Sequence, residues 1–235
     1  NVPSSTKLDT YLRVVRFTHV SELYLLFWFL LAVLMVLFVF PFFRSPSFRK
    51  QLFPQFLFFS SIGLGFIIFE LALINTFTLF LIHPVYSISV VLTSILFFSG
   101  LGSLLSSKFS LQNALKHFYW IVLGLVVYML LFTLFAEHVM SSFSSVGLGS
   151  RIIITLALLF IPNVLMGMFM PLGLRVVARA HRKYIPYVWG INGVASVLGG
   201  VGAMLFSLSY GFKATLILGA VCYFFALSIM SFKHH

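Results

Sequence analysis

FFSSIGLGFIIFELALINTF, residues Phe58 to Phe77, is an almost uninterrupted apolar run with one carboxylate, Glu70, in its interior. A helix that crosses a hydrocarbon core of about 30 Å needs about 20 mostly apolar residues, and this run supplies them. In lipid, a helix also pairs its own backbone N–H and C=O groups, which no solvent is present to satisfy. The run therefore predicts a transmembrane helix, and the fold depends on how many similar runs the chain contains.

The composition extends this prediction to the whole chain. Of its 235 residues, 61% are hydrophobic and 8% are charged, whereas soluble domains have about 45–50% apolar and about 25% charged residues. The apolar runs are continuous rather than alternating, which favours helices over strands. We expect an all-α fold, a polytopic transmembrane helix bundle. The single cysteine, Cys222, cannot form an internal disulfide.

Seven apolar segments, separated by proline, glycine or basic residues, predict about seven spans. They are Leu23–Phe43, Phe53–Ile82, His83–Leu105, Phe118–Phe135, Ile152–Val177, Pro186–Leu208 and Ala214–Phe232. Residues 1–22 mix charged and apolar side chains and form a juxtamembrane lead-in that could lie as an amphipathic segment on the lipid surface. Residues 23–235 then make a single transmembrane helical domain.

Two of these segments predict irregular helices. The segment Phe53–Ile82 would be about 45 Å long if wholly helical, so it is either tilted or broken near Asn75. The fifth segment contains Pro162 and Pro171. Each proline removes a backbone donor and clashes with the preceding turn, so a kinked or discontinuous helix is expected between them.

Basic residues predict the orientation, because loops rich in lysine and arginine stay in the cytoplasm. One side of the predicted topology carries Arg44, Arg49, Lys50, Lys108, Lys116, Arg175, Arg179, Arg182, Lys183 and Lys233; the other carries Lys7, Arg13, Arg16, Arg151 and Lys213. The larger group places the C-terminus in the cytoplasm, although the three basic residues of the lead-in oppose this orientation. The net charge of +11 indicates attraction to anionic headgroups rather than to nucleic acid, because the basic residues lie in short juxtamembrane loops.

Glu70 is the candidate for chemistry within the membrane. An ionised carboxylate at this depth costs about 2.5–3.5 kcal/mol on insertion scales, so it normally faces the protein interior. Gly63 precedes it by two helical turns and shares its face. Glu70 is either a cation or proton site, or an acid that fixes packing through a hydrogen bond. We expect it to lie against the sixth span, in a polar site with Ser196 and with Asn192 as its partner.

Small residues predict where helices approach closely. In the sixth span, the stretch WGINGVASVLGGVGAMLFS places small and polar residues at steps of three and four, which draws one stripe along a helix. Similar positions occur in SGLGS and LMGMFMPLGLR. The predicted packing residues are Gly63, Gly100, Gly102, Gly167, Gly173, Gly193, Gly199 and Ala203.

The sequence offers little for catalysis. Its only carboxylates are Asp9, Glu22, Glu70 and Glu137, too few for two-carboxylate catalysis or a carboxylate metal cage. It contains no phosphate-binding glycine motif and no zinc-type spacing of His and Cys. A haem between histidines is conceivable, but nothing in the sequence fixes their distance. We therefore predict no catalytic residues, no metal site and no cofactor.

Three blocks of the chain resemble the membrane region of a bacterial family of spermidine-synthase-like integral membrane proteins. They are IGLGFIIFELALINTFTLFLIHPVYSISVVLTSILFFSGLGSLLSSKF, PNVLMGMFMPLGLR and IPYVWGINGVASVLGGVGAMLFSLSYGF, at residues 62–109, 162–175 and 185–212. The positions matching the family's pattern are Glu70, Pro84, Gly100, Gly102, Ser103, Gly167, Pro171, Gly173, Trp189, Asn192, Gly193 and Ser196.

The resemblance implies transmembrane helices that accompany a soluble Rossmann-like domain binding S-adenosylmethionine or its decarboxylated form. It also implies a bacterial cytoplasmic membrane. The chain departs from the family in lacking the glycine-rich nucleotide loop and the acidic residues of a polyamine synthase. This chain alone is accordingly not expected to be an enzyme.

The expected function is that of a noncatalytic integral membrane module or subunit that anchors or organises partner proteins. Its partners would be the lipid bilayer and either other membrane subunits or a soluble Rossmann-like domain, with no nucleic acid. Two alternatives stay open. The first is a transporter of a small cation or polyamine that uses Glu70, and the second is the membrane half of an S-adenosylmethionine-type transferase whose soluble domain lies elsewhere.

Overall fold

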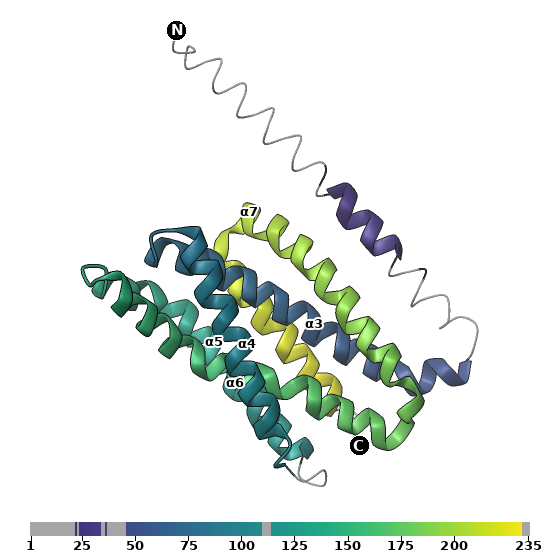
Figure 1. The fold of residues 1–235 in the computed structure, drawn as a ribbon. Coiled ribbons are helices and arrows are strands. Elements are labelled where there is room, and N and C mark those ends of the chain that lie inside the picture. The colour runs from purple at the N-terminus through teal and green to yellow at the C-terminus, as the bar shows by residue number, and fades with distance from the viewer. Residues whose placement is uncertain (1–21, 23, 34–35, 37–45, 110–113, 232–235) are drawn as a thin grey trace.

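The computed structural model describes residues 22, 24–33, 36, 46–109 and 114–231. Within these residues the chain is a bundle of helices without strands (Figure 1), as an all-α polytopic architecture requires. The predicted lead-in and most of the predicted first span lie outside the described residues, except for a short apolar helix at Tyr24–Val33.

Between residues 46 and 231, the described part of the chain forms five long helices and one short 3₁₀ turn. In chain order they are α3 (Pro46–Phe80), α4 (Pro84–Ser106), α5 (Ala114–Ser142), α6 (Leu148–His181), η2 (Arg182–Tyr184) and α7 (Ile185–Ser231). All five α-helices are long and apolar enough to cross a membrane. The predicted count of seven spans is not confirmed.

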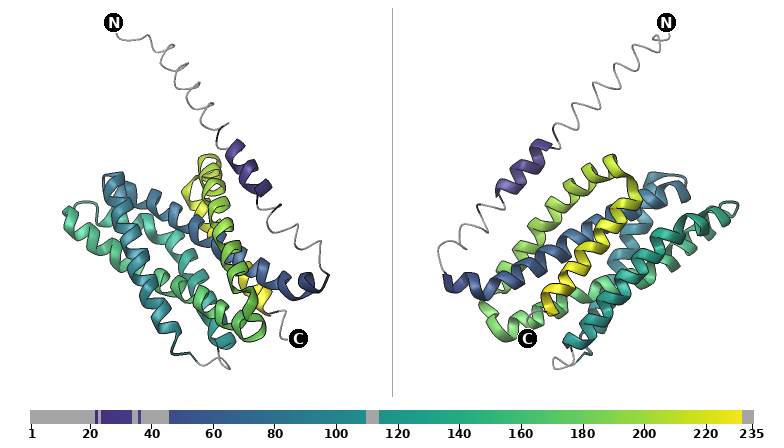
Figure 2. Two further views of the ribbon diagram at one scale, coloured as in Figure 1. Left: turned by 45° about the vertical axis from the view of Figure 1, so that its right-hand side comes forward. Right: turned by 180° about the vertical axis from the view of Figure 1, so that it is seen from behind.

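Helix α7 joins two helical arms at Gly211, whose φ of 81° and ψ of 172° are not helical. Backbone in this region is essentially restricted to glycine. The arms correspond to the predicted sixth and seventh segments, and the second arm runs back towards the end of the bundle where the first begins (Figure 1). Helix α3 lies between the two arms (Figure 2). The contact between α3 and α7 is accordingly the most extensive one between any two of the described helices.

Helix α4 begins where the sequence predicts. His83 is its N-cap and accepts a hydrogen bond from the Val85 N–H at Nδ1, at 3.3 Å. Pro84 occupies the first helical position, where the missing N–H would be unpaired in any case. The Ser87 hydroxyl then donates to the Ile74 carbonyl at 2.6 Å, which holds the start of α4 against the end of α3.

The predicted helix breaks are absent. Helix α3 continues through Asn75, whose amide donates to the Leu71 carbonyl of its own helix at 2.9 Å. Helix α6 continues through both of its prolines. Pro162 cannot donate to the Leu158 carbonyl four residues earlier, and the Tyr128 hydroxyl of α5 donates to that carbonyl instead. A bend without a break at either place stays a prediction.

The outer surface of the bundle is apolar. Leu79 is 83% exposed and Leu96 is 75% exposed, and many other large apolar side chains face outward. Aromatic side chains fill the interior, among them the fully buried Phe59, Phe69 and Tyr223. A surface of this kind suits lipid rather than water as the surrounding solvent.

Candidate functional site

One close helix pair is formed by α3 and the first arm of α7. The Asn192 amide donates to the Phe59 carbonyl at 3.1 Å, and the Ser196 hydroxyl donates to the Gly63 carbonyl at 3.2 Å. A methyl group added at Gly63 would lie 2.5 Å from the backbone oxygen of Asn192. Glycine is therefore required here so that two polar side chains of α7 can reach the backbone of α3.

A second close pair is formed by α4 and α6. Gly102 of α4 lies directly against the backbone carbonyl of Val164, and Gly167 of α6 lies directly against the backbone carbonyl of Ser99. The Asn163 amide donates to the Ser94 hydroxyl across the same contact, at 3.2 Å. Each helix thus contributes a glycine to the approach.

A cavity of about 550 Å³ lies between these two pairs. Its walls come from α3, α4, α6 and α7. They are mainly apolar, with aromatic rings supplied by Phe66, Phe169, Trp189 and Tyr223. The polar side chains among them are those of Ser99, Ser103, Asn192 and Ser196. This size and composition match those of small-molecule sites, which are apolar pockets of about 300–1,000 Å³ with a few polar groups.

The cavity brings together several residues that the sequence singles out. Gly100, Gly167, Pro171, Asn192 and Ser196 all line it. Pro171 leaves the Gly167 carbonyl, four residues earlier, without its usual helical donor. The predicted break of α6 is absent, but one of its two prolines lies in the cavity wall.

Glu70 does not join this site. It is half-buried, and no hydrogen bond or ion pair to its carboxyl group occurs within the described part of the chain. It does not line the cavity of about 550 Å³ described above, which we call the central cavity. Asn192 is wrong as its partner, because the Asn192 amide bonds to Phe59, which precedes Glu70 by 11 residues, or about 16 Å along a helix.

The predicted packing residues divide into two groups. Gly63, Gly102 and Gly167 lie in the helix contacts described above. Gly173 and Gly199 also lie at helix contacts. An added methyl group would lie 2.7 Å from the Phe58 ring at Gly173 and 2.6 Å from the Ile67 side chain at Gly199. Ala203 is buried as well, with 1% of its surface exposed.

At Gly100 and Gly193, an added methyl group would meet no described atom within 4 Å, so a packing role for these two glycines stays a prediction. Gly100 and Gly102 lie two residues apart and therefore point to nearly opposite sides of α4. Only one of them can face α6.

Sequence reasoning missed the role of two arginines, one near each end of α6. Arg175 donates to the Phe109 carbonyl at 3.0 Å and also to the Ser106 carbonyl, at the end of α4. Arg151 donates to the Phe80 carbonyl, where α3 ends, at 2.9 Å. Cationic side chains stabilise the unpaired carbonyls of helix C-termini. The sequence did place each arginine near an end of the predicted fifth segment, where the ends of neighbouring helices are also expected.

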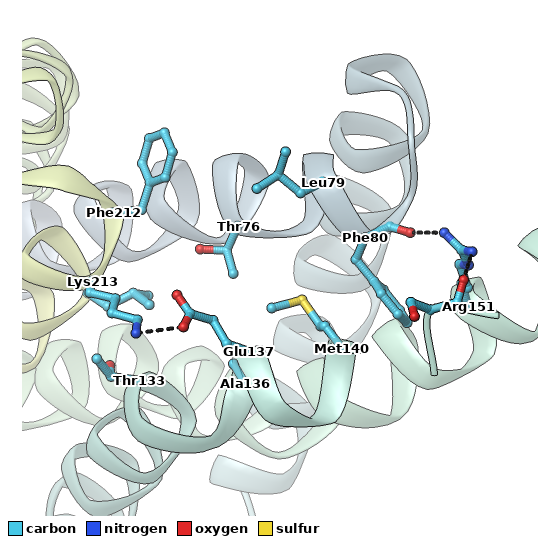
Figure 3. Close-up of a pocket in the computed structure, with 12 residues that line it drawn as sticks. Thr76, Leu79, Phe80, Thr133, Ala136, Glu137, Met140, Arg151, Phe212 and Lys213 are labelled. Atoms are coloured by element: carbon cyan, nitrogen blue, oxygen red, sulfur yellow. Dashed lines mark hydrogen bonds and ion pairs between the residues drawn. The ribbon is translucent and has the colours of Figure 1, made fainter. Parts of the chain in front are cut away.

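A smaller cavity of about 290 Å³ lies at the Arg151 end of the bundle (Figure 3). Lys213 and Glu137 form an ion pair on its wall, with 2.7 Å between Nζ and Oε2. Arg151 lies across from this pair, beyond Met140 and Phe80 in the view of Figure 3. No sequence pattern joined Lys213 to Glu137, because they are separated by 76 residues.

The described side chains offer no metal centre, since no three His, Cys, Asp or Glu residues gather among them. Comparison with protein-family models, with curated proteins and with solved structures gives no match to this chain. The resemblance to spermidine-synthase-like membrane proteins therefore stays a prediction.

Proposed function

We propose that this chain is a noncatalytic integral membrane module that anchors or organises partner proteins, in the manner of the membrane region of spermidine-synthase-like proteins. One observation carries the proposal: the polar side chains at the two close helix contacts are used to hold helices together. Asn192, Ser196 and Asn163 each bond to a neighbouring helix. In catalytic sites, by contrast, polar groups converge on a place where a substrate can react.

The absence of an acid from the central cavity supports the same proposal. A polyamine is multiply charged and needs carboxylates or several aromatic faces to replace its hydration. The described lining of the cavity contains no Asp or Glu, and Glu70 lies outside it. Cation transport through Glu70 gains no support from this arrangement.

The experiment is purification of the chain from its native membrane in a mild detergent, followed by native mass spectrometry. We expect a second protein at fixed stoichiometry and no binding of S-adenosylmethionine by the isolated chain in isothermal titration. A chain that purifies alone, with an activity of its own, would contradict the proposal. Proteoliposome uptake of spermidine that is abolished by Glu70→Gln would establish the transporter instead.

A second candidate, the membrane half of a transferase, is favoured by the size of the central cavity. A pocket of about 550 Å³ with aromatic and methionine walls suits a hydrophobic, membrane-borne substrate. The activity would need a soluble S-adenosylmethionine-binding domain. Adding that domain should give transfer to a lipid-soluble acceptor. The group transferred would be methyl from S-adenosylmethionine, which leaves S-adenosylhomocysteine, or aminopropyl from its decarboxylated form, which leaves methylthioadenosine. Gly100→Leu, which places a side chain in the cavity from a position with room for it, should lower either transfer.

We also propose that the C-terminus lies in the cytoplasm of a bacterial inner membrane. The proposal rests on the excess of arginine and lysine near the end of the bundle that holds Arg175, Arg179, Arg182 and Lys183. A C-terminal fluorescent protein that folds only in the cytoplasm should be bright. An alkaline phosphatase fusion at the same position should be inactive, and an active one would reverse the orientation.

A further inference from the structure

The smaller cavity lies where several helices end. Its wall includes Leu79 and Phe80 at the end of α3, Glu137 near the end of α5, Arg151 near the start of α6, and Lys213 just after the Gly211 turn of α7. In a bundle that spans a bilayer, helix ends lie where the hydrocarbon meets the headgroups. The cavity is therefore placed at headgroup depth.

The charged groups of this cavity are open to an outside partner. The side chains of Lys213 and Glu137 are 58% and 67% exposed despite their contact. Lys213 has two further donors, and Glu137 accepts at a second oxygen. Lys213 can thus bind an anionic group of a ligand, and Glu137 a cationic group, while the ion pair between the two side chains stays intact.

Arg151 adds a positive charge to the same cavity. Its guanidinium donates to three backbone carbonyls, those of Phe80, Val146 and Ser144. Carbonyls satisfy hydrogen bonds but carry no net charge, and no carboxylate pairs with Arg151 among the described residues. With Lys213 and Glu137, the cavity wall presents two cationic groups and one carboxylate. Both signs of charge are therefore available, which suits a ligand that carries a phosphate as well as an ammonium group.

Most of the remaining cavity wall is apolar, and it opens towards the outer surface. The hydroxyls of Thr76, Thr133 and Ser144 also line it, and each donates to a backbone carbonyl three or four residues earlier. Leu79 is 83% exposed and Phe212 is 41% exposed, and both line the cavity with Met140 and Leu216. Figure 3 shows Leu79 and Phe212 on the side of Thr76 that lies across from Glu137 and Met140. A ligand that fits must combine a charged head with an alkyl chain.

We propose that this cavity binds the headgroup of a zwitterionic aminophospholipid, with a phosphoethanolamine head. Lys213 binds the phosphate, aided by the field of Arg151, and Glu137 accepts hydrogen bonds from the primary ammonium. One acyl chain lies along Leu79 and Phe212. A primary ammonium has three N–H donors, whereas the trimethylammonium of a choline head has none. The site consequently distinguishes ethanolamine from choline, and it does not depend on the function proposed above.

The test uses the purified full chain in detergent, equilibrated with equal amounts of phosphatidylethanolamine, phosphatidylcholine and phosphatidylglycerol that share the same acyl chains. Native mass spectrometry then counts the lipid retained. Since exposed charge pairs contribute modestly, we expect about 1.5- to fivefold more ethanolamine lipid than choline lipid. Equal retention of the two, or a preference for phosphatidylglycerol, would overturn the proposal.

Two variants locate the selectivity. Glu137→Gln should remove the preference for ethanolamine over choline, while Lys213→Met should lower the retention of all three lipids. Lys108→Met is the matched control, because Lys108 is an exposed lysine at the opposite end of the bundle, and it should retain lipids as the unaltered chain does. Retained selectivity in Glu137→Gln would overturn the assignment.

The unaltered protein provides a test that needs no substitution. Adding methyl groups one at a time to the ethanolamine nitrogen removes its donors in steps but keeps its charge. Retention should fall from the unmethylated to the trimethylated lipid in the same order. A flat series would show that charge alone, and not donation to Glu137, selects the lipid.

Discussion

The two helix pairs beside the central cavity reach close contact by different means. Between α3 and α7, glycine lies on one helix, and the Asn192 and Ser196 side chains of the other donate to its backbone. Between α4 and α6, both helices carry a glycine, and each glycine meets a backbone carbonyl of the partner. The first pair therefore depends on hydrogen bonds as well as fit, whereas the second depends mainly on fit. Substitutions should separate these two dependences.

The largest effect is expected at Gly167. A side chain there would meet the backbone of Ser99, which cannot rotate away, so Gly167→Val should destabilise the bundle by about 3 kcal/mol. The measurement is unfolding in mixed micelles with a denaturing detergent. Gly100→Val is the matched control, because Gly100 faces open space on the neighbouring helix. If both cost the same, the contact between α4 and α6 is not set by steric fit.

The contact between α3 and α7 can be tested at Gly211, the turn that joins the two arms of α7. The backbone conformation at Gly211 is strained for any residue with a Cβ, so Gly211→Ala should cost about 1–3 kcal/mol. Gly193→Ala is the control, since Gly193 lies in the first arm of the same helix and an added methyl group there meets no described atom within 4 Å. The same unfolding measurement applies, and a neutral Gly211→Ala would show that the two arms do not need this turn.

Asn192 tests the hydrogen bonds directly. Asn192→Leu removes the donor to Phe59 and should cost about 0.6–1.7 kcal/mol, the range found for side-chain hydrogen bonds between membrane helices. Asn163→Leu in the second pair should cost less. Asn163 leaves its own Oδ1 buried without a partner among the described residues, and Ser94 keeps its bond to the Val91 carbonyl. The reverse order would reject the assigned difference between the pairs.

The smallest effect is expected at Lys213, which belongs to neither contact. Its ion pair with Glu137 is exposed, so Lys213→Met should change the unfolding free energy by about 0.2–1 kcal/mol. Salt screens such pairs. The difference between the variant and the unaltered protein should therefore shrink between low and molar salt, and a salt-independent loss would indicate a packing role.

Hydropathy and proline position were sufficient to predict most of the described helices. The apolar runs gave α3 to α6 and the two arms of α7, and Pro84 gave the start of α4. Helix continuity was not predictable in the same way. The carbonyl that Pro162 leaves unpaired finds the Tyr128 hydroxyl, and this donor comes from a helix 30 residues away in sequence.

The candidate site was predicted only in part, for a related reason. Helical spacing shows which residues share a face, and it correctly grouped Asn192 with Ser196. It does not give the register between two helices, so it could not show that Asn192 meets Phe59 rather than Glu70. It also could not show which of Gly100 and Gly102 faces α6, because that depends on the rotation of α4 about its axis.

The Gly211 turn also bears on how the chain enters the membrane. Between Lys183 and Lys233, the only charged residue is Lys213, and it lies two residues after the turn. A helix that continued through Ile185–Ser231 would be about 70 Å long, more than twice the hydrocarbon thickness. Folded back at Gly211, the two arms can partition from the translocation machinery as one hairpin that carries a single charge across. Insertion of α7 as one unit would then have to move a single ammonium group, that of Lys213, through the hydrocarbon.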